Sequence, residues 1–181
     1  MSGRIIIVSG PPGAGKSTVA RALADGAEGP LAVHMHTDDA YAYIRKGFVE
    51  PWRPESQAQN ITIMNALAAS AAAFAVGGYE VAVDGIVGPW FFEPWLEAAK
   101  AHDLDLRYIC LMPAEAETVA RGTARTAPGA MTDVNVITGM WQAFRKYAPP
   151  AANVLDTTGE TSAATVARVS AALAAGGLRL A

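Results

Sequence analysis

Short apolar runs bounded by turn residues alternate along the chain with longer stretches of helical periodicity. The apolar runs predict strands at residues 4–9, 31–36, 79–84, 106–112 and 153–156. Helical spacing occurs at residues 16–24, 39–46, 55–76, 89–102, 114–126, 133–147 and 161–175. Because strands that alternate with helices pair in parallel, the pattern predicts the α/β class with a parallel sheet.

Two of the predicted strands are apolar on both faces, at residues 5–8 and 81–83. Such runs suit strands that helices cover on both sides, so we expect them at the centre of the sheet. The segment 47–54, with Trp52 between two prolines, interrupts the regular pattern. It indicates a helical insertion at about residues 39–77, over the carboxyl ends of the strands, where ligands bind in open α/β sheets.

Composition narrows the class of protein. With 181 residues, 51% of them hydrophobic, we expect a single domain over residues 1–181 with one buried core. The net charge of −3 gives no general attraction to nucleic acid or to an anionic membrane. No uninterrupted apolar run reaches about 18 residues, so we expect no membrane span. The single cysteine, Cys110, lies in an apolar run and fits a reducing, cytoplasmic location.

A phosphate-binding motif, G-x-x-x-x-G-K-[ST], lies between the first predicted strand and the first predicted helix. It consists of Gly10, Pro11, Pro12, Gly13, Ala14, Gly15, Lys16 and Ser17. Glycines let the backbone wrap around phosphate oxygens, and the helix N-terminus supplies N–H donors. We expect Lys16 to reach the β- and γ-phosphates, Ser17 to meet Mg²⁺, and Thr18 to support the helix start.

With this loop, and with Asp38, Asp84, Arg121 and Arg125, the chain resembles P-loop kinases of the nucleoside-monophosphate-kinase type. Within them it is most similar to the small AAA-type ATPase and kinase-like group that includes chloramphenicol phosphotransferase, gluconate kinase and the zeta toxins. The resemblance implies a three-layer α/β/α P-loop NTPase fold with a five-stranded parallel sheet in the order 2-3-1-4-5. It also implies a helical lid at about residues 121–133, with ATP and Mg²⁺ as cofactors.

Two strand-end aspartates are candidates for chemistry. In the resembling kinases the carboxylate at the place of Asp38 accepts the proton of the acceptor hydroxyl. The neighbouring Asp39 is the candidate cap of a helix that begins at Ala40, and the two roles could be exchanged. Asp84 matches an acid near the metal, although it could instead hold the substrate or bind the amides of residues 85–88.

The predicted lid carries two arginines, Arg121 and Arg125, four residues apart on a predicted helix. They would share a face and turn towards the same phosphate region, unless both are simply solvated. A turn at residues 126–131 would let the lid close and exclude water.

Aromatic residues gather in the insertion and after the third predicted strand, where an acceptor pocket is expected, although aromatics at helical spacing also form cores. The substrate candidates are Asp38, Tyr41, Arg45, Trp52, Asp84 and Trp90. After the last strand, Thr157 lies where related kinases pass the adenine, and no guanine-recognition motif occurs, which favours ATP over GTP. His34 and His36 share a strand face, but without a nearby cysteine or third histidine we expect no zinc site.

These features predict an ATP-dependent kinase with a small-molecule alcohol as acceptor, such as an antibiotic, a sugar or a nucleoside. One alternative is a nucleotide-hydrolysing switch that acts on a protein partner. Another is a polynucleotide 5′-hydroxyl kinase, which would need a basic groove that the acidic composition disfavours. The identity of the acceptor and the oligomeric state are left open by the sequence.

Overall fold

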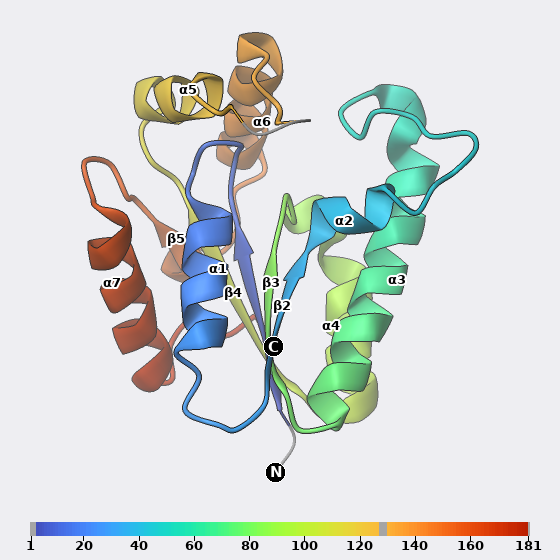
Figure 1. The fold of residues 1–181 in the computed structure, drawn as a ribbon, viewed down its shortest axis with the longest axis vertical. Helices are drawn as coiled ribbons and strands as arrows, with labels where there is room; N and C mark the ends of the chain where they lie inside the picture. The colour runs from blue at the N-terminus through green and yellow to red at the C-terminus, as the bar shows by residue number, and fades with distance from the viewer. Residues whose placement is uncertain (1–2, 127–129, 181) are drawn as a thin grey trace.

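A computed structural model describes residues 3–126 and 130–180 and shows a central sheet with helices on both faces (Figure 1). The strands are β1 (Arg4–Ser9), β2 (Ala32–His36), β3 (Glu80–Asp84), β4 (Asp105–Leu111) and β5 (Val154–Leu155). All pairs are parallel and the order is β2-β3-β1-β4-β5. The predicted fold class and strand order are therefore confirmed.

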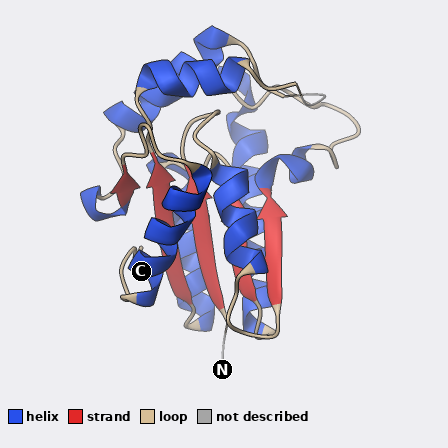
Figure 2. Ribbon diagram, turned by 60° about the vertical axis from the view of Figure 1, so that its left-hand side comes forward, coloured by secondary structure: helices blue, strands red, loops and turns tan. Residues whose placement is uncertain are grey.

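The helices form two layers around the sheet and a third group beyond its carboxyl edge (Figure 2). Helices α1 and α7 cover one face, α3 and α4 cover the other, and α5 and α6 lie beyond the strand ends (Figure 1). Their bounds are α1 (Lys16–Asp25), α2 (Thr37–Tyr41), α3 (Gln57–Val76), α4 (Phe92–His102), α5 (Glu115–Thr123), α6 (Val134–Lys146) and α7 (Ser162–Ala174). Single 3-10 turns occur at Pro54–Ser56, Pro89–Phe91 and Ala151–Asn153.

Strand β1 explains why the core has two halves. Ile5 and Ile7 are fully buried in the core between the sheet and α3 and α4. Ile6 and Val8 are fully buried in the core that includes α1 and α7. Because successive side chains of a strand point to opposite faces, only a strand that is apolar throughout can serve both halves. This confirms the central position that the sequence predicted for β1.

The segment Pro54–Val76, which contains α3, is long and apolar enough to cross a membrane by length and composition, with a mean hydropathy of 1.2. In the structure Leu67, Ala71 and Ala75 are buried in the core beside β1 and β3. A core helix of this kind passes the same test, so the segment is weak evidence for a membrane span.

Two predicted helices are shorter than expected. The helix predicted at residues 39–46 is α2, which begins at Thr37 and ends at Tyr41. Residues 42–56, here called the strap, are irregular apart from the 3-10 turn at Pro54–Ser56, and side-chain bonds from α3 help to hold them. The Gln59 side chain accepts from Val49 N at 2.9 Å and donates to Val49 O at 2.7 Å. Tertiary hydrogen bonds thus replace the local ones that the sequence pattern suggested.

The second is α5, predicted to extend to residue 126, which ends at Thr123. The Thr123 hydroxyl turns back and donates to the Val119 carbonyl at 2.9 Å. Such local side-chain bonds compete with the next turn of a helix. Arg125 therefore lies beyond the end of the helix. The thiol of Cys110 is buried in β4, and burial raises its pKa to about 12, which makes it unreactive.

Candidate active site

The phosphate-binding loop connects β1 to α1, as predicted. Its glycines have left-handed backbone, with φ of 140° at Gly10, 87° at Gly13 and 90° at Gly15. A Cβ added to Gly10 would lie 2.3 Å from the Leu111 carbonyl oxygen, and one added to Gly13 would lie 2.4 Å from that of Thr118. Only glycine fits these two positions, and the loop is consequently held against β4 and α5.

Lys16, the first residue of α1, is partly buried and folds back onto its own loop. Its ammonium group donates to the Pro11 carbonyl at 2.9 Å. Burial lowers the pKa of Lys16 to about 8, although the carboxylates of Asp38 and Asp84 act in the opposite direction. An anionic ligand in the loop would favour the charged form of Lys16, so the residue is suited to bind phosphate.

Asp84 lies at the end of β3 and contacts Ser17, the other residue predicted to meet the metal. The Ser17 hydroxyl donates to Asp84 Oδ2 at 2.5 Å. On the other side, His34 Nε2 lies 2.5 Å from Asp84 Oδ1, and His36 Nε2 lies 3.7 Å from Oδ2. Asp84 has no exposed surface. Its carboxylate is therefore fixed from three sides, directly beside the first turn of α1.

We did not predict the contact of His34 with Asp84 from the sequence, because the two histidines were considered there only as possible zinc ligands. A signal was available in their alternation along β2, which places both on one face of the strand. The strand register then brings this face next to Asp84, because His36 of β2 pairs directly with Asp84 of β3. The two imidazoles therefore reach the same carboxylate.

The chemistry of these groups fits Mg²⁺, which prefers oxygen ligands and keeps several waters and phosphate oxygens. The Ser17 hydroxyl and the Asp84 carboxylate offer two oxygens in direct contact. Across residues 3–126 and 130–180, no group of three or more His, Cys, Asp or Glu side chains could hold a metal ion by itself. A metal held here would need further ligands from nucleotide phosphates and water, as Mg²⁺ bound to a nucleotide does.

Asp38 and Asp39 both lie in the first turn of α2, which begins at Thr37 and not at Ala40. Among the described residues no side chain caps this helix, so the prediction that Asp39 caps it is wrong. Both carboxylates are well exposed, at 70% for Asp38 and 74% for Asp39. Only Asp38 of the two lines the cavity described below, where His36 Nε2 lies 3.8 Å from its Oδ2.

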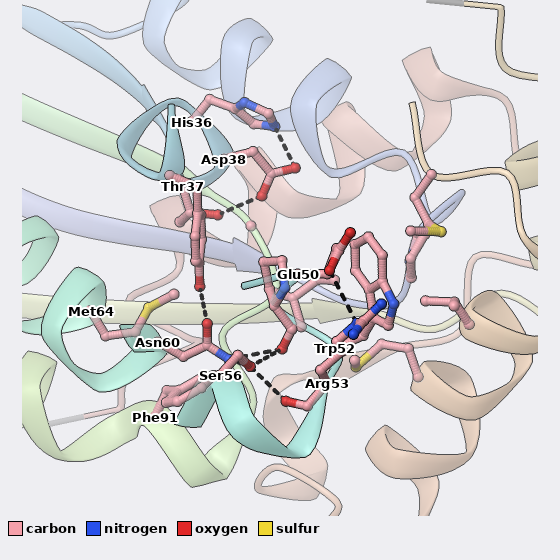
Figure 3. Close-up of a pocket in the computed structure, with 18 of the residues that line it drawn as sticks. His36, Thr37, Asp38, Glu50, Trp52, Arg53, Ser56, Asn60, Met64 and Phe91 are labelled. Atoms are coloured by element: carbon pink, nitrogen blue, oxygen red, sulfur yellow. Dashed lines mark hydrogen bonds and ion pairs between the residues drawn. The ribbon is translucent and has the colours of Figure 1, made fainter. Parts of the chain in front are cut away.

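A cavity of about 1100 Å³ lies between the strap and α3 on one side and residues 125 and 130–140 on the other. Lys16 and Ser17 reach it from the phosphate-binding loop. Figure 3 shows Asp38 at one end, with Glu50, Trp52 and Arg53 of the strap near Ser56 and Asn60. Of the residues predicted for the site, those that line it are Pro12, Lys16, Ser17, Asp38, Tyr41, Trp52, Trp90 and Arg125. The phosphate-binding loop thus opens into an acceptor-sized space.

Other predicted site residues lie elsewhere. Arg45 is exposed and does not line the cavity, so the structure does not support its predicted contact with the substrate. Asp84 is buried and does not line the cavity, but it contacts Ser17 and lies near His36, which both do. Thr157 is buried after β5, and its hydroxyl finds no hydrogen-bond partner among the described residues.

The two arginines of the predicted lid do not share a helical face, because α5 ends before Arg125. Arg121 forms an ion pair with Glu117 and donates to the Glu160 carbonyl at 3.2 Å, away from the cavity. Arg125 lines the cavity near Lys16. The predicted lid turn at 126–131 includes residues 127–129, which lie outside the described residues.

Among the cavity residues that were not predicted are three polar ones, Glu50, Ser56 and Asn60. Arg53 Nε lies 3.1 Å from Glu50 Oε2. Asn60 accepts from the Tyr41 hydroxyl at 3.0 Å and donates to the Pro51 carbonyl at 2.8 Å and to Ser56 Oγ at 2.9 Å. Ser56, which directly precedes α3, Asn60 and Met64 follow one another at intervals of four residues, so all three lie on one side of the helix, and this was the signal in the sequence.

Comparison with solved structures shows the same fold in several kinases. The APS kinase of Mycobacterium tuberculosis, in complex with AMPPNP and APS, is 17% identical with a TM-score of 0.66, over 96% of this chain and 98% of that one. A sugar kinase from Janibacter sp. HTCC2649 is 16% identical with a TM-score of 0.70, over 95% of each chain. A gluconokinase from Sinorhizobium meliloti 1021 is 17% identical with a TM-score of 0.62, over 97% of this chain and 94% of that one.

No curated protein matches the sequence significantly. The family model described as AAA domain, AAA_33, matches residues 5–150, which span the phosphate-binding loop, Asp38, Asp84 and both arginines of the predicted lid. The fold, the loop geometry and this match agree, and the kinase-like fold implies nucleotide binding. The chain belongs to the AAA_33 family of P-loop, kinase-like AAA domains.

Proposed function

We propose that this protein is an ATP-dependent kinase that transfers the γ-phosphate of ATP to a hydroxyl of a small molecule. The observation that carries the proposal is the single cavity in which Lys16 and Ser17 of the phosphate-binding loop face Asp38 and an aromatic chamber. A pure hydrolase would need no such chamber. The kinases of similar fold support the reaction class, and one of them holds AMPPNP and APS together.

In the proposed reaction, the acceptor oxygen attacks the γ-phosphorus while the bond to the bridging oxygen breaks and ADP leaves. The hydroxyl proton passes to Asp38, which lines the cavity as Asp39 does not. Lys16 and Arg125 stabilise the charge on the transferred group. Ser17 and Asp84 would hold Mg²⁺, which would neutralise part of the negative charge of the phosphates. The carboxylate of Asp84 is fixed in advance by its contact with His34.

The proposal extends to the identity of the nucleotide, the class of partner and the cellular location. We place the adenine near Thr157 and favour ATP, since the chain has no guanine-recognition motif. A polynucleotide partner would need a basic groove, yet the described lining of the cavity mixes Lys16, Arg53 and Arg125 with acidic side chains. A free, buried Cys110 suits the reducing cytoplasm, where ATP is abundant.

The test is a screen of the purified protein with Mg-ATP against antibiotics, sugars, sugar acids and nucleosides. ADP release and the mass of each acceptor are followed together, with Lys16→Ala as the inactive control. A mass gain of one phosphoryl group, lost in the variant, is the expected result. Steady ADP release that no acceptor changes, with no phosphorylated product, would instead show a nucleotide-hydrolysing switch and overturn the proposal.

A further inference from the structure

Each lysine or arginine that the structure describes in the cavity lining either lies at the phosphate end or is paired with an acid. Lys16 donates to the Pro11 carbonyl, and Arg125 lies near enough to lower the pKa of Lys16, so both belong to the phosphate end. Arg53 pairs with Glu50 at 3.1 Å. Within the described part of the chain, no other lysine or arginine lines the cavity. An anionic acceptor would therefore find no unpaired cation away from the phosphate end.

Negative charges face the same space. The acidic residues in the cavity lining are Asp38, Glu50 and Asp133. Asp133 accepts from the Asn135 amide at 2.8 Å and so caps α6, while Asp38 is the proposed base. A carboxylate or sulfate on the acceptor would approach these groups with like charge, which costs free energy in a partly desolvated site.

Three neutral polar side chains of the cavity wall, Tyr41, Ser56 and Asn60, bond to one another or to the strap. Both hydrogens of the Asn60 amide are donated, one to the Pro51 carbonyl and one to Ser56 Oγ. Its oxygen accepts from Tyr41, whose pKa burial raises to about 12, so that the hydroxyl keeps its proton. The Ser56 hydroxyl lies 2.8 Å from the Pro51 carbonyl and 2.7 Å from the Arg53 carbonyl. A polyol would find these hydrogen-bonding groups already satisfied.

Apolar side chains supply the remaining surface on both sides of the cavity. They are Ile44, Phe48, Trp52, Met64, Ile86, Trp90, Phe91, Met131, Val136 and Met140. Trp52 and Phe48 on the strap are 47% and 49% exposed, while Trp90 is held by packing against Phe144 and Tyr147. Exposed aromatics facing a packed aromatic wall form a surface that an apolar group would cover.

From these four observations we infer that the acceptor is an uncharged or cationic alcohol that carries an apolar ring or chain, and not a sugar acid, a simple polyol or a sulfated alcohol. The inference rests on the proposed function. The alcohol end lies at Asp38 and Lys16, and the apolar part lies between Trp52 and Trp90. Met64, Met131 and Met140 supply flexible side chains that adapt to its shape.

The test compares kcat/KM over a panel of alcohols sorted by charge and by apolar content, with phosphorylated product measured by mass. A matched set within it is 3-phenyl-1,2-propanediol, 3-phenyllactate and glycerol. Phenyllactate has a carboxylate in place of the primary alcohol of the diol, and glycerol has a hydroxyl in place of its phenyl ring, so the secondary hydroxyl is common to all three. We expect the best acceptors of the panel to be uncharged or cationic with an apolar part, at least tenfold above anionic compounds and plain polyols. A sugar acid, sulfated alcohol or plain polyol as the best acceptor would overturn this inference and leave the proposed kinase standing. ADP release with no phosphorylated alcohol in any class would overturn the kinase itself.

A pair of variants tests the charge argument separately. Glu50→Gln removes the partner of Arg53. The ratio of kcat/KM for 3-phenyl-1,2-propanediol to kcat/KM for 3-phenyllactate should therefore fall several-fold, while the KM for ATP stays constant. Glu55→Gln is the matched control, because Glu55 is exposed on the same segment and does not line the cavity. An unchanged preference in Glu50→Gln would show that the ion pair plays no part in excluding anions. Trp52→Ala should raise the KM for the phenyl diol, and an unchanged KM would remove the aromatic wall from the inference.

Discussion

Replacing Gly13 by alanine tests whether the phosphate-binding loop is fixed by its contact with α5. Gly13 has φ of 87°, and an added Cβ would lie 2.4 Å from the Thr118 carbonyl oxygen and 2.9 Å from the Gly122 nitrogen. Both are backbone atoms, so neither can rotate out of the way. Gly15 offers a matched control in the same loop, because its φ is 90° but an added Cβ would meet nothing within 4 Å.

The two substitutions separate backbone strain from a steric clash. A left-handed backbone costs an alanine about 1–2 kcal/mol, and both variants carry this cost. Crowding in a packed region adds about 1–3 kcal/mol, which only Gly13→Ala incurs. We therefore expect Gly15→Ala to lose about 1–2 kcal/mol of unfolding free energy and Gly13→Ala about 2–5 kcal/mol. For a chain of this length, 1 kcal/mol corresponds to about 2–4 °C, so the Tm values should differ by about 2–12 °C.

The measurement is thermal and urea unfolding without nucleotide, so that effects on ATP binding do not enter. Gly159→Ala is a second control outside the loop, since Gly159 has φ of 71° and an added Cβ would meet nothing within 4 Å. It should match Gly15→Ala. Equal Tm values for Gly13→Ala and Gly15→Ala would refute the reasoning, because α5 would then have moved away from the loop without cost.

Three further predictions concern the reacting groups. Asp38→Asn should keep ATP affinity and lower kcat by at least about a hundredfold, whereas Asp39→Asn should stay near wild type; full turnover in the first variant would remove the base from the mechanism. Because the folded-state pKa of Lys16 is about 8 and its ordinary value is 10.5, the unfolded chain binds more protons between these values. The unfolding free energy of wild type relative to Lys16→Met should therefore rise with pH across that window in nucleotide-free protein, and a constant difference would contradict the burial of the ammonium. His34→Ala removes the contact that orients one oxygen of the Asp84 carboxylate, so Mn²⁺ should bind more weakly to the protein in the presence of ATP. The Mn²⁺ concentration at half-saturation, measured by electron paramagnetic resonance, should rise several-fold. An unchanged value would mean that His34 does not position Asp84.

Much of the fold could be predicted because its determinants are local or follow from general rules. The apolar run of β1 indicated a strand covered on both faces, and the glycine motif after it indicated the turn into α1. The strand order followed from resemblance to a family. The errors fell where tertiary contacts decide local structure. The strap left the helical path because α3 supplies its hydrogen bonds, and no pattern within residues 42–56 contains that information.

In the candidate site, too, the part built from consecutive residues could be predicted and the part built by tertiary contacts could not. The phosphate end is built by consecutive residues, so one motif predicted both the loop and the position of Lys16. The acceptor end is assembled from α2, the strap, α3 and the region around α6, which are brought together only by folding. Aromatic content predicted Trp52 and Trp90 there. The pairing of Glu50 with Arg53, on which the inference about the charge of the acceptor rests, could be seen only in the structure.

Arg121 and Arg125 show what a spacing argument omits. Four-residue spacing places two side chains on one face only where the helix continues, and α5 ends between them. The sequence also contained a competing partner, because Glu117 precedes Arg121 by four residues and forms an ion pair with it. That pair commits Arg121 to α5. Arg125, which lies beyond the end of the helix, lines the cavity near Lys16, and under the proposed function it is therefore the arginine placed to stabilise charge on the phosphoryl group during transfer.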